Sequence, residues 1–301
     1  MIVGMPPGGG ADAYARVVAR HLSAHLPGAP SIVVENVPGA GSLKALYYLD
    51  GLPADGNAIA TFSSGLLTEA ITSPERVKVD FRKYAWVGNV SPDVRVCYVR
   101  RGASARTWQD LLARGQVVFA ASARGTAGNV DTAMLRALFG LKLKEVEGYA
   151  GSAAKRLAVE RGEVDGDCGG FASIPQDWLG AGKVDVVVRL SPVLLPGMNA
   201  QVPYAGDLLK SARDRALYDF LMAPETLGRP FLVSGRVPAA QVAALRRAFS
   251  AMLADPDFRK DADRTGLTVA PMSGEEVARA VAALYATAPD LVKRAKAIAG
   301  Q

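Results

Sequence analysis

The chain repeats one pattern, in which a short apolar run is followed by glycines and then by apolar residues at helical spacing. "MIVGM" predicts the end of a buried strand, "PPGGG" a turn, and "DAYARVVARHLSAHL" a helix. The pattern returns as a strand at 32–35, a Pro-Gly-Ala-Gly turn and a helix through Tyr48, and again as the strand "AIATF" before a turn at 63–65. Strands that alternate with helices in this way predict an α/β fold with a mostly parallel sheet.

A second set of the same elements begins near residue 96. "VRVCYVRRGA" predicts an alternating strand and "TWQDLLARG" a short helix, and then "QVVFAAS", "ARGTAGN" and "VDTAMLRALFG" predict a strand, a glycine turn and a helix. A helix through Arg161 and the strand "GEVDGDCGGF" complete this half, and the tail predicts a strand at 230–234 and an amphipathic helix at 239–253. We therefore expect two domains, one of residues 1–95 with 226–301 and one of residues 96–225.

The composition is that of a soluble globular protein. Half of the 301 residues are apolar and 21% are charged, and lysine and arginine exceed the acidic residues by six. This charge favours anionic partners, but the basic residues are scattered and do not alternate with aromatics, so nucleic acid is not expected as a partner. No apolar run reaches about 18 residues, and we expect no stable membrane insertion.

The cysteines and histidines do not show the spacing of a common metal site. Cys97 and Cys168 fit no zinc pattern and are either free buried thiols or one disulfide. His21 and His25 lie four residues apart, as in a metal pair, but "HLSAH" lacks the glutamate of a metalloprotease and no third ligand is apparent. Because the glutamate and a third ligand are missing, a solvated helix face is favoured. We expect neither a metal site nor a cofactor.

The glycine run at 8–10 is the first candidate for ligand chemistry. Glycines between a strand and a helix let backbone amides approach an anion closely. The dinucleotide fingerprint G-x-G-x-x-G is incomplete because Ala13 stands in place of the third glycine, and a G-x-x-x-x-G-K-[ST] phosphate loop is absent. An enzyme acting on a nucleotide or acyl anion therefore remains an alternative, as does a plain tight turn.

Other polar residues stand beside glycine turns. No serine occupies a G-x-S-x-G motif, so Ser63, Ser64, Ser122 and Ser152 predict hydrogen bonds to a ligand oxygen or ordinary turns. Arg124 is a cation within a glycine turn, where it is either a carboxylate partner or a surface residue. Asp165 and Asp167 form a paired acid site or cap turns at the end of a strand. If either faces a ligand, a protonated or hydroxyl-bearing group is implied.

Four stretches together resemble the extracytoplasmic solute-binding proteins of tripartite tricarboxylate transporters, the TctC/Bug family. They are "PPGGGADAYARVVARHL", "IVVENVPGAGSLKALYYL", "VEGYAGSAAKRLAVERGEVDG" and "RVPAAQVAALRRAFSAMLADPDF", and the likeness covers almost the whole chain in order. The most specific parts are the P-x-G-G-x-x-D-type loop at 6–12 and the E-N-x-P-G-A-G turn at 35–41. The second half matches the family at 149–152 and at 162–165.

The resemblance implies a two-domain periplasmic-binding-protein type II fold, the Venus flytrap, with strands crossing the hinge. It implies capture of a small di-, tri- or aromatic carboxylate without catalysis or cofactor, and delivery by a monomer to the membrane subunits of a transporter. Asp12 would cap the helix or hold the glycine loop. The implied ligand-binding residues are Pro7, Gly8, Gly9, Gly10, Ala11, Asp12, Ser63, Ser64, Gly65, Ser122, Ala123, Arg124, Gly125, Thr126, Asn129, Tyr149 and Asp167.

The resemblance also implies a periplasmic location. Family members begin with an export signal and a complete first strand, whereas this sequence opens part-way into the strand. We expect a removed signal or a misassigned start, and an intracellular effector-sensing module is the alternative. The second loop departs from the family pattern at Arg124 and Thr126, which predicts a ligand other than the family's commoner ones.

Overall fold

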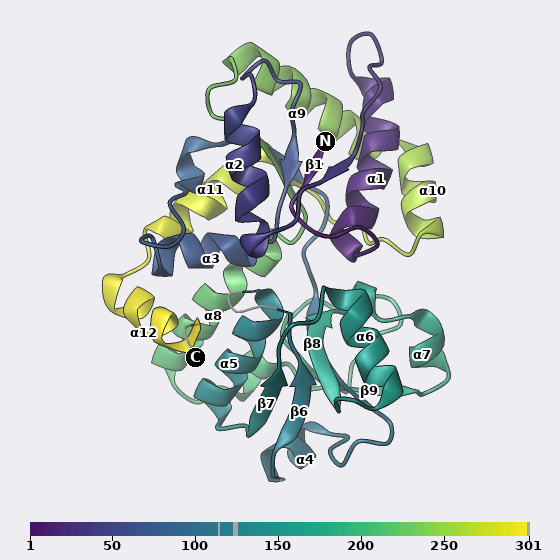
Figure 1. Ribbon diagram of the computed structural model, residues 1–301, viewed down its shortest axis with the longest axis vertical. Coiled ribbons are helices and arrows are strands. Elements are labelled where there is room, and N and C mark those ends of the chain that lie inside the picture. The colour runs from purple at the N-terminus through teal and green to yellow at the C-terminus, as the bar shows by residue number, and fades with distance from the viewer. Residues whose placement is uncertain (114, 123–125, 300–301) are drawn as a thin grey trace. The chain divides into compact units, whose positions relative to one another are not determined.

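The computed structural model describes residues 1–113, 115–122 and 126–299, and the chain divides into two compact units (Figure 1). The first unit comprises Met1–Pro92 and Thr226–Thr287, and the second comprises Asp93–Glu225 and Ala288–Gln301. The chain therefore passes between the units three times, at 92–93, 225–226 and 287–288. None of the helices in the described ranges is long and apolar enough to span a bilayer.

The sheet of the first unit has the strand order β11-β4-β10-β3-β1-β2. Its strands are β1 (Ile2–Val3), β2 (Glu35–Asn36), β3 (Ala60–Thr61), β4 (Ala85–Asn89), β10 (Pro230–Val233) and β11 (Met272–Ser273). β1 pairs in parallel with β2 and β3, whereas β10 runs antiparallel to β3 and β4 and β11 antiparallel to β4. Because parallel strands end at one edge, the segments that follow β1, β2 and β3 lie at the same edge of this sheet.

Helices cover both faces of this sheet. They are α1 (Gly10–Leu22), α2 (Leu43–Gly51), α3 (Gly65–Thr72), α9 (Ala239–Ala254), α10 (Pro256–Arg264) and α11 (Gly274–Tyr285), with short 3₁₀ turns at Ser23–His25, Ala40–Ser42 and Phe81–Lys83. Side chains of α1, α9 and α10 form a core with Phe231 on one side. Those of α2, α3 and α11 form a second core with Phe62 and Phe81 on the other. This layered packing is the expected doubly covered α/β arrangement.

Two expectations for the first unit need correction. The strand expected at 32–35 is β2 at Glu35–Asn36, because its pairing partners are Ile2 and Val3, and Val33 is left 75% exposed. The two histidines do not lie on a solvated face. His21 of α1 contacts Asp261 of α10 at 3.1 Å, and His25, in the 3₁₀ turn after α1, contacts Asp255 just before α10 at 3.0 Å.

The sheet of the second unit has the order β7-β6-β8-β5-β9, in which β5 runs antiparallel to both neighbours. Its strands are β5 (Arg95–Arg100), β6 (Val117–Ala120), β7 (Leu143–Val146), β8 (Gly166–Gly170) and β9 (Val184–Arg189). Its helices are α4 (Trp108–Ala113), α5 (Ala127–Phe139), α6 (Ser152–Arg161), α7 (Gln176–Gly180), α8 (Ala212–Thr226) and α12 (Pro289–Ala299), with 3₁₀ turns at Phe171–Ser173 and Ala205–Leu208.

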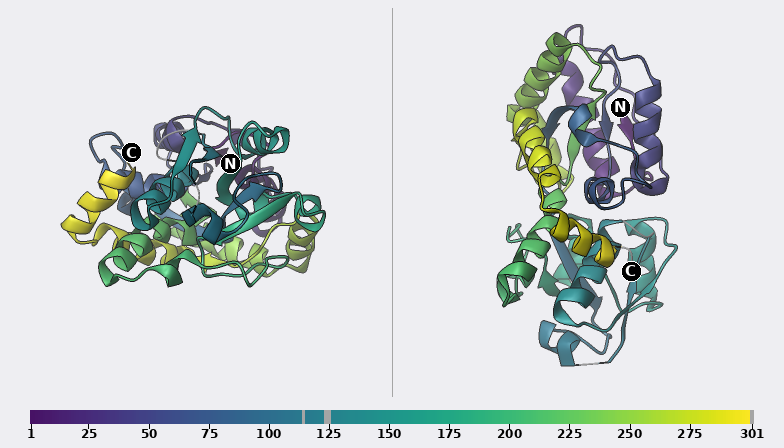
Figure 2. Two further views of the ribbon diagram at one scale, coloured as in Figure 1. Left: turned by 90° about the horizontal axis from the view of Figure 1, so that it is seen from below. Right: turned by 90° about the vertical axis from the view of Figure 1, so that its left-hand side faces the viewer.

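The last helix, α12, packs against α5 in the second unit, although its residues were expected with the first domain. Its apolar side is buried at Ala295 and Ile298. Figure 2 shows this helix in yellow beside the elements of the second unit. The amphipathic helix expected at 239–253 is confirmed as α9, so the tail divides between the two units.

Candidate functional site

The glycine loop joins β1 to α1. Gly8 has φ +79°, a left-handed conformation that glycine adopts without strain, and Gly9 precedes the first turn of the helix. The first amides of a helix have no acceptor within it and carry partial positive charge. Residues 9–11 are only partly buried. The loop therefore presents backbone donors suited to an anion.

Asp12 holds this loop in shape, which is one of the two roles expected for it. Its carboxylate is buried and accepts hydrogen bonds from the Gly8 amide and from Arg16 Nε, each at 2.9 Å. Burial alone would raise the pKa of Asp12, but the hydrogen bonds from Arg16, Gly8 and Asn36 outweigh it and lower that pKa. Asp12 stays charged, and Arg16 cancels its charge beside the loop.

Arg229 lies beside the same helix start and was not found from the sequence. Its Nη2 is 3.5 Å from where a Cβ on Gly10 would stand, and its guanidinium lies over the Tyr14 ring at 5.3 Å. The Arg229 amide donates to Oδ1 of Asn89, at 2.9 Å. Only the insertion of β10 between β3 and β4 brings this arginine to α1, and local sequence gives no signal for that pairing.

The predicted residues 63–65 lie at the same sheet edge as the glycine loop. They follow β3, which is the parallel neighbour of β1, and Gly65 begins α3. Ser64 is buried, and the Ser63 amide donates to Oγ of Ser42 at 3.0 Å. The structure thus gathers the first-unit residues of the predicted set around one edge.

The second-unit residues gather around the start of α5. Ser122 follows β6 and Thr126 immediately precedes α5, while Ala123, Arg124 and Gly125 lie outside the described residues. The Gly148 amide donates to the Ser122 carbonyl at 2.9 Å. The Tyr149 amide donates to the carbonyl of Ala121. The segment that carries Tyr149 therefore lies beside Ser122.

The side chains of two predicted residues bind partners within the second unit. Asn129 is buried, and its Nδ2 donates to Glu145 at 3.1 Å. Asp167 is buried in β8 and accepts from Lys155 Nζ at 2.6 Å. Asp165, the other aspartate considered in the sequence, accepts from the amide of Val118 in β6 at 3.0 Å.

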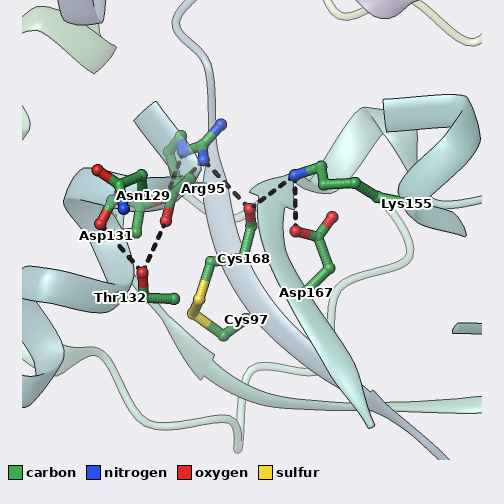
Figure 3. The surroundings of a disulfide bond; sticks show 9 residues. Arg95, Cys97, Asn129, Asp131, Thr132, Lys155, Asp167 and Cys168 are labelled. Atoms are coloured by element: carbon green, nitrogen blue, oxygen red, sulfur yellow. Dashed lines mark hydrogen bonds and ion pairs between the residues drawn. A yellow bond between two sulfur atoms is a disulfide. The ribbon is translucent and has the colours of Figure 1, made fainter. Parts of the chain in front are cut away.

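A buried charged cluster underlies the start of α5 (Figure 3). Arg95 donates from Nε to Asp131 at 2.8 Å and from Nη1 to Asp93 at 3.2 Å. Arg95 and Lys155 approach the Cys168 carbonyl from opposite sides, at 3.4 and 3.5 Å. A Cβ added to Gly128, in the first turn of α5, would stand 2.9 Å from that carbonyl oxygen.

Burial dominates the pKa of the two carboxyl groups Asp131 and Asp167 in this cluster. It raises the pKa of Asp131 and of Asp167 by more than the neighbouring cations lower them. Burial by itself would lower the pKa of Arg95, but Asp131 and Asp93 outweigh it, so this pKa is raised and the guanidinium stays charged. The cluster is therefore an ion-pair network whose members depend on one another.

Cys97 and Cys168 form a disulfide, which decides between the two alternatives left open by the sequence. They face one another in the antiparallel pairing of β5 with β8. Within the described ranges, no group of three or more His, Cys, Asp or Glu side chains is arranged to hold a metal ion.

No protein-family model matches the chain. A curated relative from Pseudomonas sp. strain P51, described as a UPF0065 protein in the tcbD–tcbE intergenic region, is 29% identical over 169 residues. This match covers 54% of the chain and 49% of the relative, so the chain matches about half the length of that protein.

Solved structures match over nearly the whole chain, and the three described here each cover 99% of it. The periplasmic binding protein BugD has a TM-score of 0.78 at 20% identity over 96% of its own length. A protein of R. palustris solved with adipate has a TM-score of 0.77 at 19% identity over 96% of its length. MatC from Rhodopseudomonas palustris with bound malate has a TM-score of 0.72 at 17% identity over 97% of its length.

These matches establish the class of fold. The chain has the two-domain type II fold of periplasmic binding proteins, built on two mixed α/β sheets. The resemblance to TctC/Bug solute-binding proteins that the sequence motifs predict is confirmed at the level of the fold.

Proposed function

We propose that this protein is an extracytoplasmic solute-binding protein of the TctC/Bug type that captures a small organic carboxylate without catalysing a reaction. The single observation that carries the proposal is the glycine loop. Its helix-start residues are only partly buried, and the carboxylate of Asp12 beside them is bonded to the Gly8 amide and paired with Arg16. Such a surface favours an anion without a dedicated side chain for it.

The proposed ligand contacts are the predicted residues. In the first unit they are the loop at 7–12 and the turn at 63–65; in the second they are the residues around the start of α5 with Tyr149. The adipate and malate that accompany two of the structural relatives support a carboxylate ligand. Ligand-driven closure, which we include in the proposal, follows when the closed form gains contacts with the ligand that the open form lacks.

The disulfide and the relatives support an extracytoplasmic location. Disulfides persist in oxidising compartments, and BugD is described as periplasmic. We propose that the loaded protein, as a monomer, delivers its ligand to the membrane subunits of a tripartite transporter. Thiol titration of the unfolded protein from its own cells should find no free cysteine; two free thiols would argue for a reducing compartment instead.

Thermal-shift and calorimetric titration test the binding proposal. The panel contains malate, adipate, citrate and benzoate, each paired with its uncharged amide as a control of matched shape. A ligand at about one hundred times its Kd should raise the melting temperature by about 2–5 °C, and the amides should not. A panel in which only nucleotides or nicotinamide cofactors raise the melting temperature would refute the proposal and favour the enzyme alternative.

A further inference from the structure

The E-N-x-P-G-A-G turn is among the most specific motifs of the sequence, yet it supplies none of the proposed ligand contacts. It begins in β2 and ends before α2, at the sheet edge that carries the glycine loop and the turn at 63–65. Its contacts, together with those of the adjacent Ser42, run to both of these segments. We call residues 35–42 the connecting segment.

Asn36 ties the two sides of the glycine loop together. Its Nδ2 donates to the Met5 carbonyl at 3.0 Å, before the glycines, and to Asp12 Oδ1 at 2.9 Å, after them. Its Oδ1 accepts from Arg16 Nη2 at 3.0 Å. Both the NH₂ and the oxygen of the Asn36 side chain are therefore hydrogen-bonded. Asp12, Arg16 and Asn36 are each bonded to the other two.

Ser42 ties the end of β1 to the turn at 63–65. Its Oγ donates to the Gly4 carbonyl at 2.9 Å and accepts from the Ser63 amide at 3.0 Å. Ser42 is buried, and a Cβ added to Gly4 would stand 2.5 Å from the Ser42 Cβ. This close approach requires glycine at position 4.

The backbone that brings Ser42 to this place is strained. Residues 39 to 42 have φ values of +140°, +45°, +62° and +85°, and two of them, Ala40 and Ser42, are not glycine. Left-handed conformations at such residues persist only where the surroundings impose them, and they concentrate at functional sites. A glycine at position 42 would relieve this strain, but it would lack the hydroxyl that bonds Gly4 and Ser63.

We propose that Asn36 and Ser42 are positioning residues that hold the glycine loop and the turn at 63–65 in the geometry required for ligand binding. This inference rests on the proposed function for its effect on affinity. Loops that are ordered before the ligand arrives need no ordering upon binding, so their amides bind more tightly. The connecting segment thus acts on the ligand through two neighbouring segments that it fixes.

The first test compares Ser42→Gly with Ser42→Ala. Both remove the hydroxyl, but only glycine also removes the backbone strain. We expect Ser42→Gly to melt within a few degrees of the wild type and yet to bind its carboxylate about tenfold more weakly. Ser42→Ala should lose both stability and affinity. Wild-type affinity in Ser42→Gly would overturn the role of Ser42.

The second test reverses the hydrogen bond between Asn36 and Asp12. Asn36→Asp sets two carboxylates against one another, so affinity should fall about tenfold at pH 8 and recover toward pH 5, where one of them takes up a proton. The double variant D12N/N36D restores one charge and the donor between the two positions, although not the bond from residue 36 to the Met5 carbonyl, and it should recover part of the binding at pH 8. A double variant as weak as the single one would contradict the proposal, because a merely structural defect would not be repaired by the exchange.

A readout in the ligand-free protein keeps this inference separate from the proposed function. Amide hydrogen exchange across residues 5–14 and 62–66 should become about tenfold faster in Asn36→Asp and in Ser42→Gly, respectively. Unchanged exchange in both variants would overturn the inference even if the wild type binds carboxylates. Faster exchange with a wild type that binds no carboxylate would uphold the positioning role and refute the proposed function.

Discussion

The two helix starts, α1 in the first unit and α5 in the second, are supported by ion pairs in opposite environments. At α1, Arg16 pairs with Asp12 and its side chain is 46% exposed. At α5, Arg95 pairs with Asp131 and its side chain is 7% exposed. An exposed cation is partly screened by water, whereas a buried pair depends on both members because each has given up its hydration.

This difference separates two ways of supporting the start of a helix. The first unit shapes its loop with glycines and cancels one carboxylate at the surface. The second unit sets its helix on a rigid base, in which the Cys168 carbonyl is bonded by two cations and its side chain belongs to the disulfide. We expect the second unit to be the more sensitive to substitution.

The largest effect should follow removal of the disulfide. Cys97→Ala with Cys168→Ala opens a loop that spans a sequence separation of 71 residues, which corresponds to about 4 kcal/mol of unfolding free energy. Urea unfolding combined with peptide-resolved hydrogen exchange should show the loss in β5 and β8. Reduction of the wild type should reproduce it, and a variant as stable as the wild type would contradict the rigid-base description.

Arg95→Met should come next, at about 3 kcal/mol, because Asp131 would be left charged and buried without its cation. The cost should shrink from pH 7 to pH 5, since the pKa of Asp131 is already raised and its protonated form needs no cation. The matched control Arg16→Met should lose far less in the same urea titrations. Equal losses in the two variants would abolish the contrast between the helix starts.

Two glycine substitutions sharpen the comparison further. Gly128→Ala pushes a Cβ to 2.9 Å from the Cys168 oxygen and should cost about 1–3 kcal/mol. Gly9→Ala meets its nearest neighbour, the Pro6 oxygen, at 3.9 Å with φ at −86°, so it should change stability by less than about 0.5 kcal/mol. Thermal denaturation of both variants measures this difference, and the reverse order would be incompatible with the packing described.

The effect of Asp12→Asn should be smaller than that of Arg95→Met, and it should depend on pH. The pKa of Asp12 is lowered on folding, so its contribution to stability is present above its unfolded value, near 4, and is lost as the pH falls through the folded value. Asp12→Asn should therefore cost about 1 kcal/mol at pH 7, and this cost should disappear as the pH falls through the folded pKa of Asp12. A stability difference that persists unchanged in acid would mean that the Asp12 charge is not what holds the loop. The pKa of Asp167 is raised on folding, so its ionisation lowers the stability of the protein as the pH rises above its unfolded value.

The sequence predicts the repeated strand–turn–helix units well, because the apolar patterns and the glycine turns are local signals. Helices α1, α6 and α9 fall close to where the spacing places them. The expected strand at 32–35 is displaced because the extent of β2 depends on its partner β1, which lies elsewhere in the chain. Strand β4 was not predicted, and β10 is antiparallel in the sheet, which no local pattern indicates.

The residues of the candidate site also fall into those that local sequence indicates and those that depend on tertiary contacts. The glycine loop and the residues at 63–65 were found because glycine and serine after a strand are visible in the sequence. Arg229 and Lys155 were missed because a basic residue inside an ordinary stretch gives no signal of what it will contact. The ionic partner of Asp167, twelve residues away on α6, became visible only once β8 and α6 were placed together.

The three passages of the chain between the units have a consequence for synthesis on the ribosome. The amino-terminal segment emerges first, but β3 lacks its neighbour β10, and one face of the sheet lacks α9 and α10, until residues 226–287 have followed. The first unit is complete only after residue 287 has been translated, and the second only after α12 has followed. During this time the nascent chain exposes an unpaired strand edge and apolar side chains, which are features that chaperones bind.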